Sequence, residues 1–273
     1  MINIIRLILV CELTPQMLFG SPKACEQQAE KTYKQFVDDY KNVTDDRTSE
    51  VYEHLLPGFR ELAISLRLDQ IWTDFGPGQC KAIDDYFKMG NFVARIQAVG
   101  KTGFHDVIGR YSHPDVYQRL KLLQNQGRFA PIFDIYLERL IPALQLTTDL
   151  GTDVFGPFSY SLHPDKVVNN YLRYLKVGGI LKIVANDKDL FGQSKTDFGP
   201  WLNKFKGIEW TQEISSKDPT GRGGRFPLVS LTLKRVALEL FVPRLKVVKY
   251  QLDEFYKIPI RTYEVELEET EAE

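Results

Sequence analysis

Hydrophobic positions at helical spacing dominate the first part of the chain. Between residues 27 and 40, apolar side chains recur every three or four positions with charged residues between them, which predicts an amphipathic helix. A second helical pattern runs from 49 to 67, and Pro57 with Gly58 is expected to break it into two pieces. Both precede the first strand candidate, so we expect these helices to cover part of a sheet.

From residue 70 onward, short apolar runs alternate with helical patterns. Helices are predicted at 81–87 and 163–175, between extended segments. Parallel strands are joined through such helices, so the alternation predicts an α/β fold with a mostly parallel sheet. The predicted extended segments lie at 71–74, 92–99, 128–138, within 141–160, and at 180–184.

The turn after the first of these strands carries candidate chemistry. Gly76 and Gly78 lie between a strand and a helix, where glycines let the backbone approach a ligand and the helix start offers N–H groups. Asp74 at the strand end can accept hydrogen bonds from loop amides or from a cationic amine. The same residues also suit an ordinary strand-to-helix turn, so both interpretations stay open on this motif alone.

Three passages, in this order, resemble the class I S-adenosylmethionine-dependent methyltransferases. TDFGPGQ at 73–79 is similar to the first motif of that family, TDLGTDVFGPFSY at 148–160 to its fourth-strand segment, and LKVGGILKI at 175–183 to its passage into the fifth strand. The resemblance covers about residues 65–236. It implies a Rossmann-like, doubly wound, mostly parallel sheet of about seven strands with an antiparallel closing pair, N-terminal helices and a short C-terminal extension.

The resemblance also implies S-adenosylmethionine as the cofactor and methyl transfer to an unidentified acceptor as the function. The second strand ends without the acid that commonly binds ribose hydroxyls in such folds, so Gln97 is expected to substitute for it. Glu138 is expected either on the adenine side or as a surface acid. The implied cofactor-binding residues are Asp74, Phe75, Gly76, Gly78, Gln79, Gln97, Glu138 and Asp149.

The acceptor is expected beyond the fourth strand. Methyl transfer needs a nucleophile in line with the sulfonium methyl and shielded from water, and Asp153, Tyr160 and His163 are the candidate catalytic residues. Phe155, Phe158 and Tyr160 predict an apolar, aromatic acceptor pocket, although they suit packing of the next helix equally well. His163 also stands where a residue would cap that helix.

Two other function classes stay open. The missing ribose acid is compatible with a catalytically inactive methyltransferase-like fold that serves as a binding or interaction module. A weaker alternative is another enzyme on the same scaffold, such as an aminopropyltransferase, but the acidic acceptor pocket that a polyamine requires is not visible in the sequence. The GRGGR run at 221–225 suits a solvated turn, or contact with a phosphate or RNA backbone.

Composition excludes several alternatives. With 43% hydrophobic residues the chain is expected to be globular, and 35 Lys and Arg against 36 Asp and Glu give no overall signal for nucleic acid. The three cysteines include no CxxC spacing, so the sequence predicts neither a disulfide framework nor a zinc site. The four histidines show no paired spacing, so no metal site is predicted.

The two ends of the chain are expected to lie outside the methyltransferase-like domain, which is placed at 26–236. The apolar run at 2–10 is too short to span a bilayer and lacks a preceding basic segment. Residues 1–25 are therefore expected to be a retained, irregular N-terminus of a cytoplasmic protein, with a degenerate export signal as the alternative. Residues 237–273 are expected to form a C-terminal extension of strands or arms with an acidic tail.

Overall fold

The structure is a computed structural model of the 273-residue chain. The predicted N-terminal apolar run, the GRGGR run and the acidic tail lie outside the described residues. Within the part that is described, no helix combines the length and the apolar character needed to cross a membrane. The described residues are 22–39, 47–100, 114–133, 135–185, 191, 197–215, 228–252 and 259–266.

One large sheet of seven strands organises the fold, in the order β3-β2-β1-β4-β5-β7-β6. The first five strands in the chain pair in parallel, whereas β7 runs antiparallel to both β5 and β6. The predicted mostly parallel, doubly wound α/β fold with an antiparallel closing strand is therefore confirmed. The strands are β1 Ile71–Phe75, β2 Arg95–Val99, β3 Phe129–Ile132, β4 Thr148–Val154, β5 Leu175–Ala185, β6 Ile208–Ser215 and β7 Leu228–Arg235.

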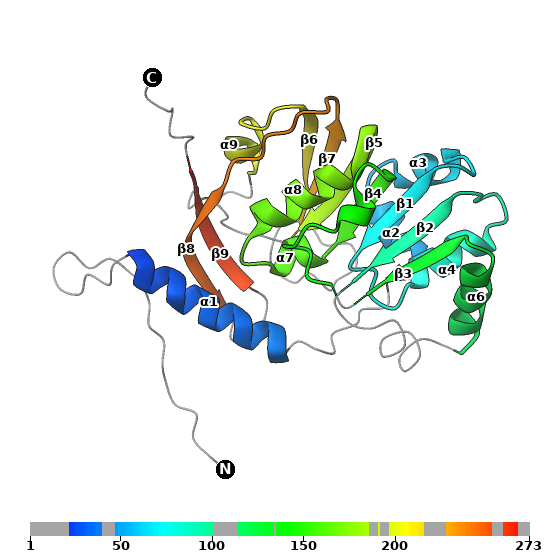
Figure 1. Cartoon of the computed structure of the whole chain (residues 1–273), viewed down its shortest axis with the longest axis horizontal. Coiled ribbons are helices and arrows are strands. Elements are labelled where there is room, and N and C mark those ends of the chain that lie inside the picture. The colour runs from blue at the N-terminus through cyan, green and yellow to red at the C-terminus, as the bar shows by residue number, and fades with distance from the viewer. Residues whose placement is uncertain are drawn as a thin grey trace, which may run out of the picture.

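Helices cover both faces of this sheet (Figure 1). The predicted break after the second helical pattern is confirmed, because Gly58 adopts a left-handed backbone with φ 69° between two short helices. One face is covered by α2 Ser49–Leu55, α3 Phe59–Ser65, α4 Lys81–Lys88 and α6 Pro114–Asn125. The other is covered by α7 Pro157–Tyr160, α8 Pro164–Tyr174 and α9 Gly199–Leu202.

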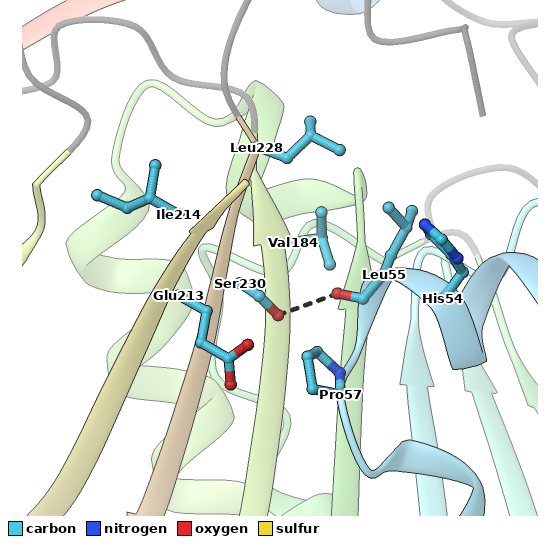
Figure 2. Close-up of a pocket in the computed structure, with 8 residues that line it drawn as sticks. All are labelled: His54, Leu55, Pro57, Val184, Glu213, Ile214, Leu228 and Ser230. Atoms are coloured by element: carbon cyan, nitrogen blue, oxygen red, sulfur yellow. Dashed lines mark hydrogen bonds between the residues drawn. The ribbon is translucent and has the colours of Figure 1, made fainter. Parts of the chain in front are cut away.

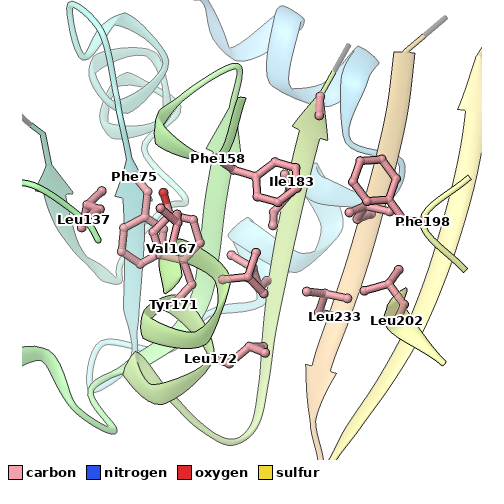
Figure 3. Packing of buried hydrophobic residues seen from close by; sticks show 14 of the residues in the cluster. Phe75, Leu137, Phe158, Val167, Tyr171, Leu172, Ile183, Phe198, Leu202 and Leu233 are labelled. Carbon is pink, nitrogen blue, oxygen red and sulfur yellow. The ribbon is translucent and has the colours of Figure 1, made fainter. Parts of the chain in front are cut away.

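The short strand β1 faces a separate core on each side, because side chains alternate along a strand. Trp72 is fully buried in the cluster beneath α2, α3 and α4, where its ring lies 5.2 Å from that of Phe59. Phe75 points to the opposite face and stacks on Tyr171 of α8 with ring centroids 4.0 Å apart (Figure 3). The strand is thus buried on both faces, and its polar residues Thr73 and Asp74 are buried as well.

The switch in winding direction lies between β1 and β4. These strands are neighbours, with Asp74 opposite Thr152, and they lead into helices on opposite faces of the sheet. In open α/β sheets, the crevice at the carboxyl ends of two such strands is where ligands bind. The fold therefore brings the turn at 76–80 and the turn at 155–157 to one position.

A separate layer joins the two ends of the chain. Helix α1 Pro22–Asp39 packs against the hairpin of β8 Leu245–Leu252 and β9 Pro259–Val265 (Figure 1). Ala29 and Tyr250 share a small apolar cluster with Leu162, which precedes α8. The strands predicted after residue 237 are thus present. The expectation that the first helix covers the large sheet was wrong, because its apolar face is used by this hairpin. We call α1, β8 and β9 the cap.

Several boundaries differ from the sequence expectations: β2 begins at Arg95 rather than at 92, and β5 begins at Leu175 rather than at 180. The third strand ends at Ile132, whereas the extended pattern continued to 138. The segment before β4 contains a short 3-10 helix, η1 Pro142–Leu144, so β4 begins only at Thr148. Pro142 fits the first position of that turn because its missing N–H would have no partner there.

Candidate functional site

The glycine turn sits at the carboxyl end of β1, as the sequence predicted. Gly76 and Gly78 have φ angles of 75° and 55°, which residues with a side chain rarely adopt. Cys80 is also left-handed, with φ 57°, and begins α4 without a side-chain hydrogen bond that caps the helix. The first turn of α4 therefore presents backbone N–H groups toward the crevice.

Asp74 lies beneath this turn and is almost fully buried. One carboxylate oxygen accepts a hydrogen bond from the Tyr52 hydroxyl at 2.8 Å, and the other accepts from the Thr152 hydroxyl at 2.7 Å. Burial raises the pKa of Asp74 to about 6, partly offset by these two donors and by the nearby Arg47 guanidinium. The side chain expected to contact the ligand is thus engaged by α2 and β4.

Gly76 is held from three directions. Its N–H donates to the carbonyl of Val99 at 2.8 Å, and its own carbonyl accepts from Arg47 Nη2 at 2.8 Å. A Cβ atom at this position would lie 2.7 Å from Cδ of Pro157 in the turn after β4. Glycine is therefore required here by contact with the neighbouring turn, whatever the ligand.

Asp153 is fully buried at the carboxyl end of β4. It accepts hydrogen bonds from the backbone N–H groups of Gly156 at 2.6 Å and Phe158 at 2.9 Å, and from the Tyr171 hydroxyl at 2.8 Å. Burial raises its pKa to about 6, and these donors and Arg47 work in the opposite direction. The carboxylate thus stabilises the turn after β4.

The end of β2 lacks the ribose contact that was expected from Gln97. Gln97 lies in the middle of the strand, and its side chain accepts from the Thr73 hydroxyl at 3.1 Å. The strand ends at Val99, followed by Gly100, where a Cβ would lie 2.9 Å from the Phe133 ring. The structure therefore does not bring Gln97 to the crevice, and the residues after Gly100 are outside the described part.

Comparison with known proteins gives similarities at low identity. No protein-family model and no curated protein matches the chain. Among solved structures, the chain is similar to a geranyl diphosphate methyltransferase in complex with S-adenosylmethionine, with TM-score 0.46, 14% identity, and 69% of this chain and 85% of that chain covered.

Two further structures are similar to the chain at the same level. One is the [4+2]-cyclase SpnF, with TM-score 0.46, 13% identity, and 69% of this chain and 81% of that chain covered. The other is the antibiotic-resistance methyltransferase Kmr, with TM-score 0.44, 16% identity, and 73% and 98% covered. The fold assignment itself rests on the strand order and pairing.

Asp149 lies at the amino end of β4, the opposite end of the strands from the glycine turn. It sits at the start of β4, where its carboxylate accepts from the Ile71 N–H at 2.8 Å and pairs with Lys176 at 2.7 Å. These contacts fix the amino ends of β1 and β5. Asp149 therefore does not lie near Gly76 and Gly78.

Glu138, Tyr160 and His163 lie together under the cap. Glu138 accepts hydrogen bonds from the hydroxyls of Tyr33 and Ser161. His163 stands at the N-cap position of α8, but its ring makes no capping bond and instead contacts Glu30 of α1 at 3.0 Å. The carbonyl of Tyr160 accepts from the hydroxyl of Tyr250 at 3.1 Å. The cap therefore contacts all three residues, through the side chains of Glu138 and His163 and through the backbone carbonyl of Tyr160.

The three aromatic residues after β4 do not form one pocket. Phe158 is fully buried on the α8 face of the sheet, with the Arg261 guanidinium 5.4 Å from its ring centroid. Phe155 packs against the core on the α2 face. The packing interpretation fits Phe158 best, because its ring has no access to the crevice.

Sequence reasoning missed Arg47, Tyr52 and Tyr171. Each contributes to the surroundings of a buried carboxylate, but each comes from a segment remote in sequence from that carboxylate. A tyrosine at helical spacing is interpreted as a core residue. The flanking sequence does not show that its hydroxyl makes a hydrogen bond to a carboxylate. Among the described residues, no group of three or more histidine, cysteine, aspartate or glutamate side chains is arranged to hold a metal.

Proposed function

We propose that the protein binds S-adenosylmethionine in the crevice between β1 and β4 and transfers its methyl group to an acceptor. The observation that carries this proposal is the strand, glycine turn and uncapped helix start at the topological switch point of a sheet with the order β3-β2-β1-β4-β5-β7-β6. Backbone strain at this position supports the proposal. Cys80 and Phe155 lie in the two turns that flank the crevice, and they are non-glycine residues with φ angles of 57° and 50°.

The described residues fit the methionine end of this cofactor. Its carboxylate suits the N–H groups at the start of α4, since helix N-termini bind anions. Gly78 leaves room for close backbone approach. When bound, the cofactor would supply an electrophilic methyl group on a positively charged sulfur. The chain itself contributes position and shielding from water, which is most of what such a transfer requires.

We therefore propose fewer cofactor-binding and catalytic residues than the sequence suggested. Gly78, Gln79 and the start of α4 are the proposed cofactor contacts, with Phe75 and Gly76 shaping the turn from below. Asp74 and Asp153 are proposed as positioning residues, because both carboxylates already accept hydrogen bonds from the protein. Gln97, Asp149 and Glu138 are not retained as contacts, and Tyr160 and His163 are not retained as catalytic residues.

A second candidate function is an interaction module on the same fold. It is favoured by one specific observation: β2 ends at Val99 and Gly100 with no acid for a ribose. In that case the glycine turn would serve only packing, as the contact between Gly76 and Pro157 already does.

Titration with S-adenosylhomocysteine separates the two candidates. Calorimetry should show saturable binding, and amide NMR shifts should concentrate at 76–82 and 154–156. Gly78→Ala is expected to weaken binding roughly tenfold or more by narrowing the approach to the backbone.

The matched control is Gly90→Ala. Gly90 also has a positive φ, of 75°, but lies in a remote turn with nothing within 4 Å of a built Cβ. Both variants therefore add backbone strain, and only Gly78→Ala should change affinity. Absence of heat and of amide shifts at millimolar ligand would eliminate methyl transfer and favour the interaction module.

A further inference from the structure

A cavity of about 300 Å³ lies between the end of α2 and the strands β5, β7 and β6 (Figure 2). Leu55, Val184 and Leu228 form apolar parts of its wall, and all three are buried. Its volume is at the lower end of the range for small-molecule sites. The cavity therefore suits a small ligand with an apolar body.

The polar groups of this cavity favour a ligand that donates hydrogen bonds. His54 and Glu213 face it from opposite walls, and the Ser230 hydroxyl between them donates its proton to the Leu55 carbonyl at 3.0 Å (Figure 2). The remaining lone pairs of that hydroxyl can only accept. The described lining residues include one carboxylate and no lysine or arginine. A cationic ligand is thus favoured over an anionic one.

A lysine of β5, Lys182, is engaged beside the lining residue Pro57. Lys182 is buried on β5, and its ammonium group donates to the Pro57 carbonyl at 2.6 Å and to the Thr232 hydroxyl at 3.1 Å. These bonds hold the turn between α2 and α3 against the sheet. Lys182 therefore holds the cavity wall at Pro57, and it lies close enough to Glu213 for that carboxylate to favour its charged form.

One lining residue links the cavity wall to the turn that follows β4. Val184 lines the cavity, and its carbonyl accepts from the N–H of Phe155 at 3.2 Å. Phe155 is the strained residue after β4, and the next residue, Gly156, has its Cα 3.0 Å from a Cβ built on Gly76. The cavity and the glycine turn thus lie on either side of the turn that follows β4.

We propose that this cavity holds the methyl acceptor, and that the acceptor is a small amine with an apolar body; this inference rests on the proposed function. Glu213 pairs with the ammonium form, and His54 removes one proton to give the nucleophilic amine. The nitrogen–carbon bond then forms as the sulfur–carbon bond breaks, and the electron pair of that bond goes to sulfur. The products are the methylated ammonium ion, S-adenosylhomocysteine and a proton passed from His54 to water.

The test uses phenethylamine, tyramine and hexylamine as probes, with phenylethanol and phenylacetate as matched ligands without the positive charge. Saturation-transfer NMR on the full chain should detect the amines and not the acid. Glu213→Gln should weaken amine binding roughly tenfold, because it removes the charge that pairs with the ammonium group.

Glu209→Gln is the matched control. Glu209 is an exposed carboxylate on the same strand and lies 3.9 Å from Lys234. It does not line the cavity, so this variant should bind amines as the wild type does. His54→Gln should leave amine affinity within about twofold and lower methyl transfer to the protonated amine, because the base that removes its proton is lost.

The outcomes distinguish this inference from the function on which it rests. Amine binding that Glu213→Gln weakens and Glu209→Gln spares supports the cavity assignment. Failure of all three amines to bind at millimolar concentration, equal binding of phenylacetate, or equal effects of the two glutamate variants would overturn it. S-adenosylhomocysteine binding is measured separately, so its presence without amine binding removes only the acceptor assignment.

Discussion

The Tyr52 hydroxyl donates to the buried carboxylate of Asp74 over 2.8 Å and thereby ties α2 to the end of β1. The second buried carboxylate, Asp153, instead receives two backbone N–H groups together with the Tyr171 hydroxyl. The two acids differ in how freely their donors can turn. A hydroxyl can rotate and accept a hydrogen bond, whereas a backbone N–H can only donate.

This difference predicts unequal costs for two isosteric changes. Asp153→Asn should lower the free energy of unfolding by about 1–3 kcal/mol, because the new amide NH₂ group leaves a buried donor without an acceptor. Asp74→Asn should cost less than about 1 kcal/mol, because the hydroxyls of Tyr52 and Thr152 can reorient. Denaturant unfolding at neutral pH measures both. Equal losses would show that the type of donor does not decide the cost.

The raised pKa values predict an unusual pH dependence. Both acids titrate at about 6 in the folded state, above their unfolded value, so the folded chain binds more protons between about pH 4 and 6. Their contribution therefore makes the protein more stable as the pH falls from 7 to 5, by about 1 kcal/mol for each acid.

The comparison of wild type with each asparagine variant isolates this contribution. The difference in unfolding free energy between wild type and Asp74→Asn should shift in favour of the wild type on going from pH 7 to pH 5. Lys81→Gln is a control, because its partly exposed pair with Asp85 should contribute little at either pH. A difference that stays constant with pH would mean that the pKa of Asp74 is not raised.

Phe158 is predicted to act through packing. Phe158→Ala should lower the free energy of unfolding by about 3–5 kcal/mol, because the ring is fully buried between α8 and the sheet. Leu238→Ala is the control, since Leu238 is 71% exposed and its loss should change stability by less than about 0.5 kcal/mol. A stable Phe158→Ala variant with reduced methyl transfer would restore the acceptor pocket that the sequence suggested.

The spacing of residues within single segments predicted the helices, strands and turns that form within those segments. The break at Pro57 and Gly58, the strand and turn at 71–80 and the helix after His163 each follow from spacing and turn residues within one segment. Their alternation was enough to predict a parallel sheet. The partner of α1 was missed, because amphipathic spacing shows that a face is buried and not what buries it.

The site was predicted less well for two physical reasons. The pattern at 141–160 did not fix where β4 begins, so the position of Asp149 at the amino end of the sheet was not predictable. Side chains such as Glu138 and His163 were expected near a ligand because they follow strands in the chain. Their surroundings depend on the cap, which brings Tyr33 and Glu30 to them from the far end of the sequence.

The cap also has a consequence for the order in which the chain folds. Helix α1 leaves the ribosome before any strand of the sheet, yet its partner β8 follows all seven of those strands in the chain. The apolar side of α1, including Ala29 and Tyr33, therefore lacks its β8 partner while the strands of the sheet are made. The contact between Tyr33 and Tyr250 joins segments that are far apart in the sequence. During synthesis α1 is a hydrophobic segment in need of protection, and closing the cap is the step that ends that exposure.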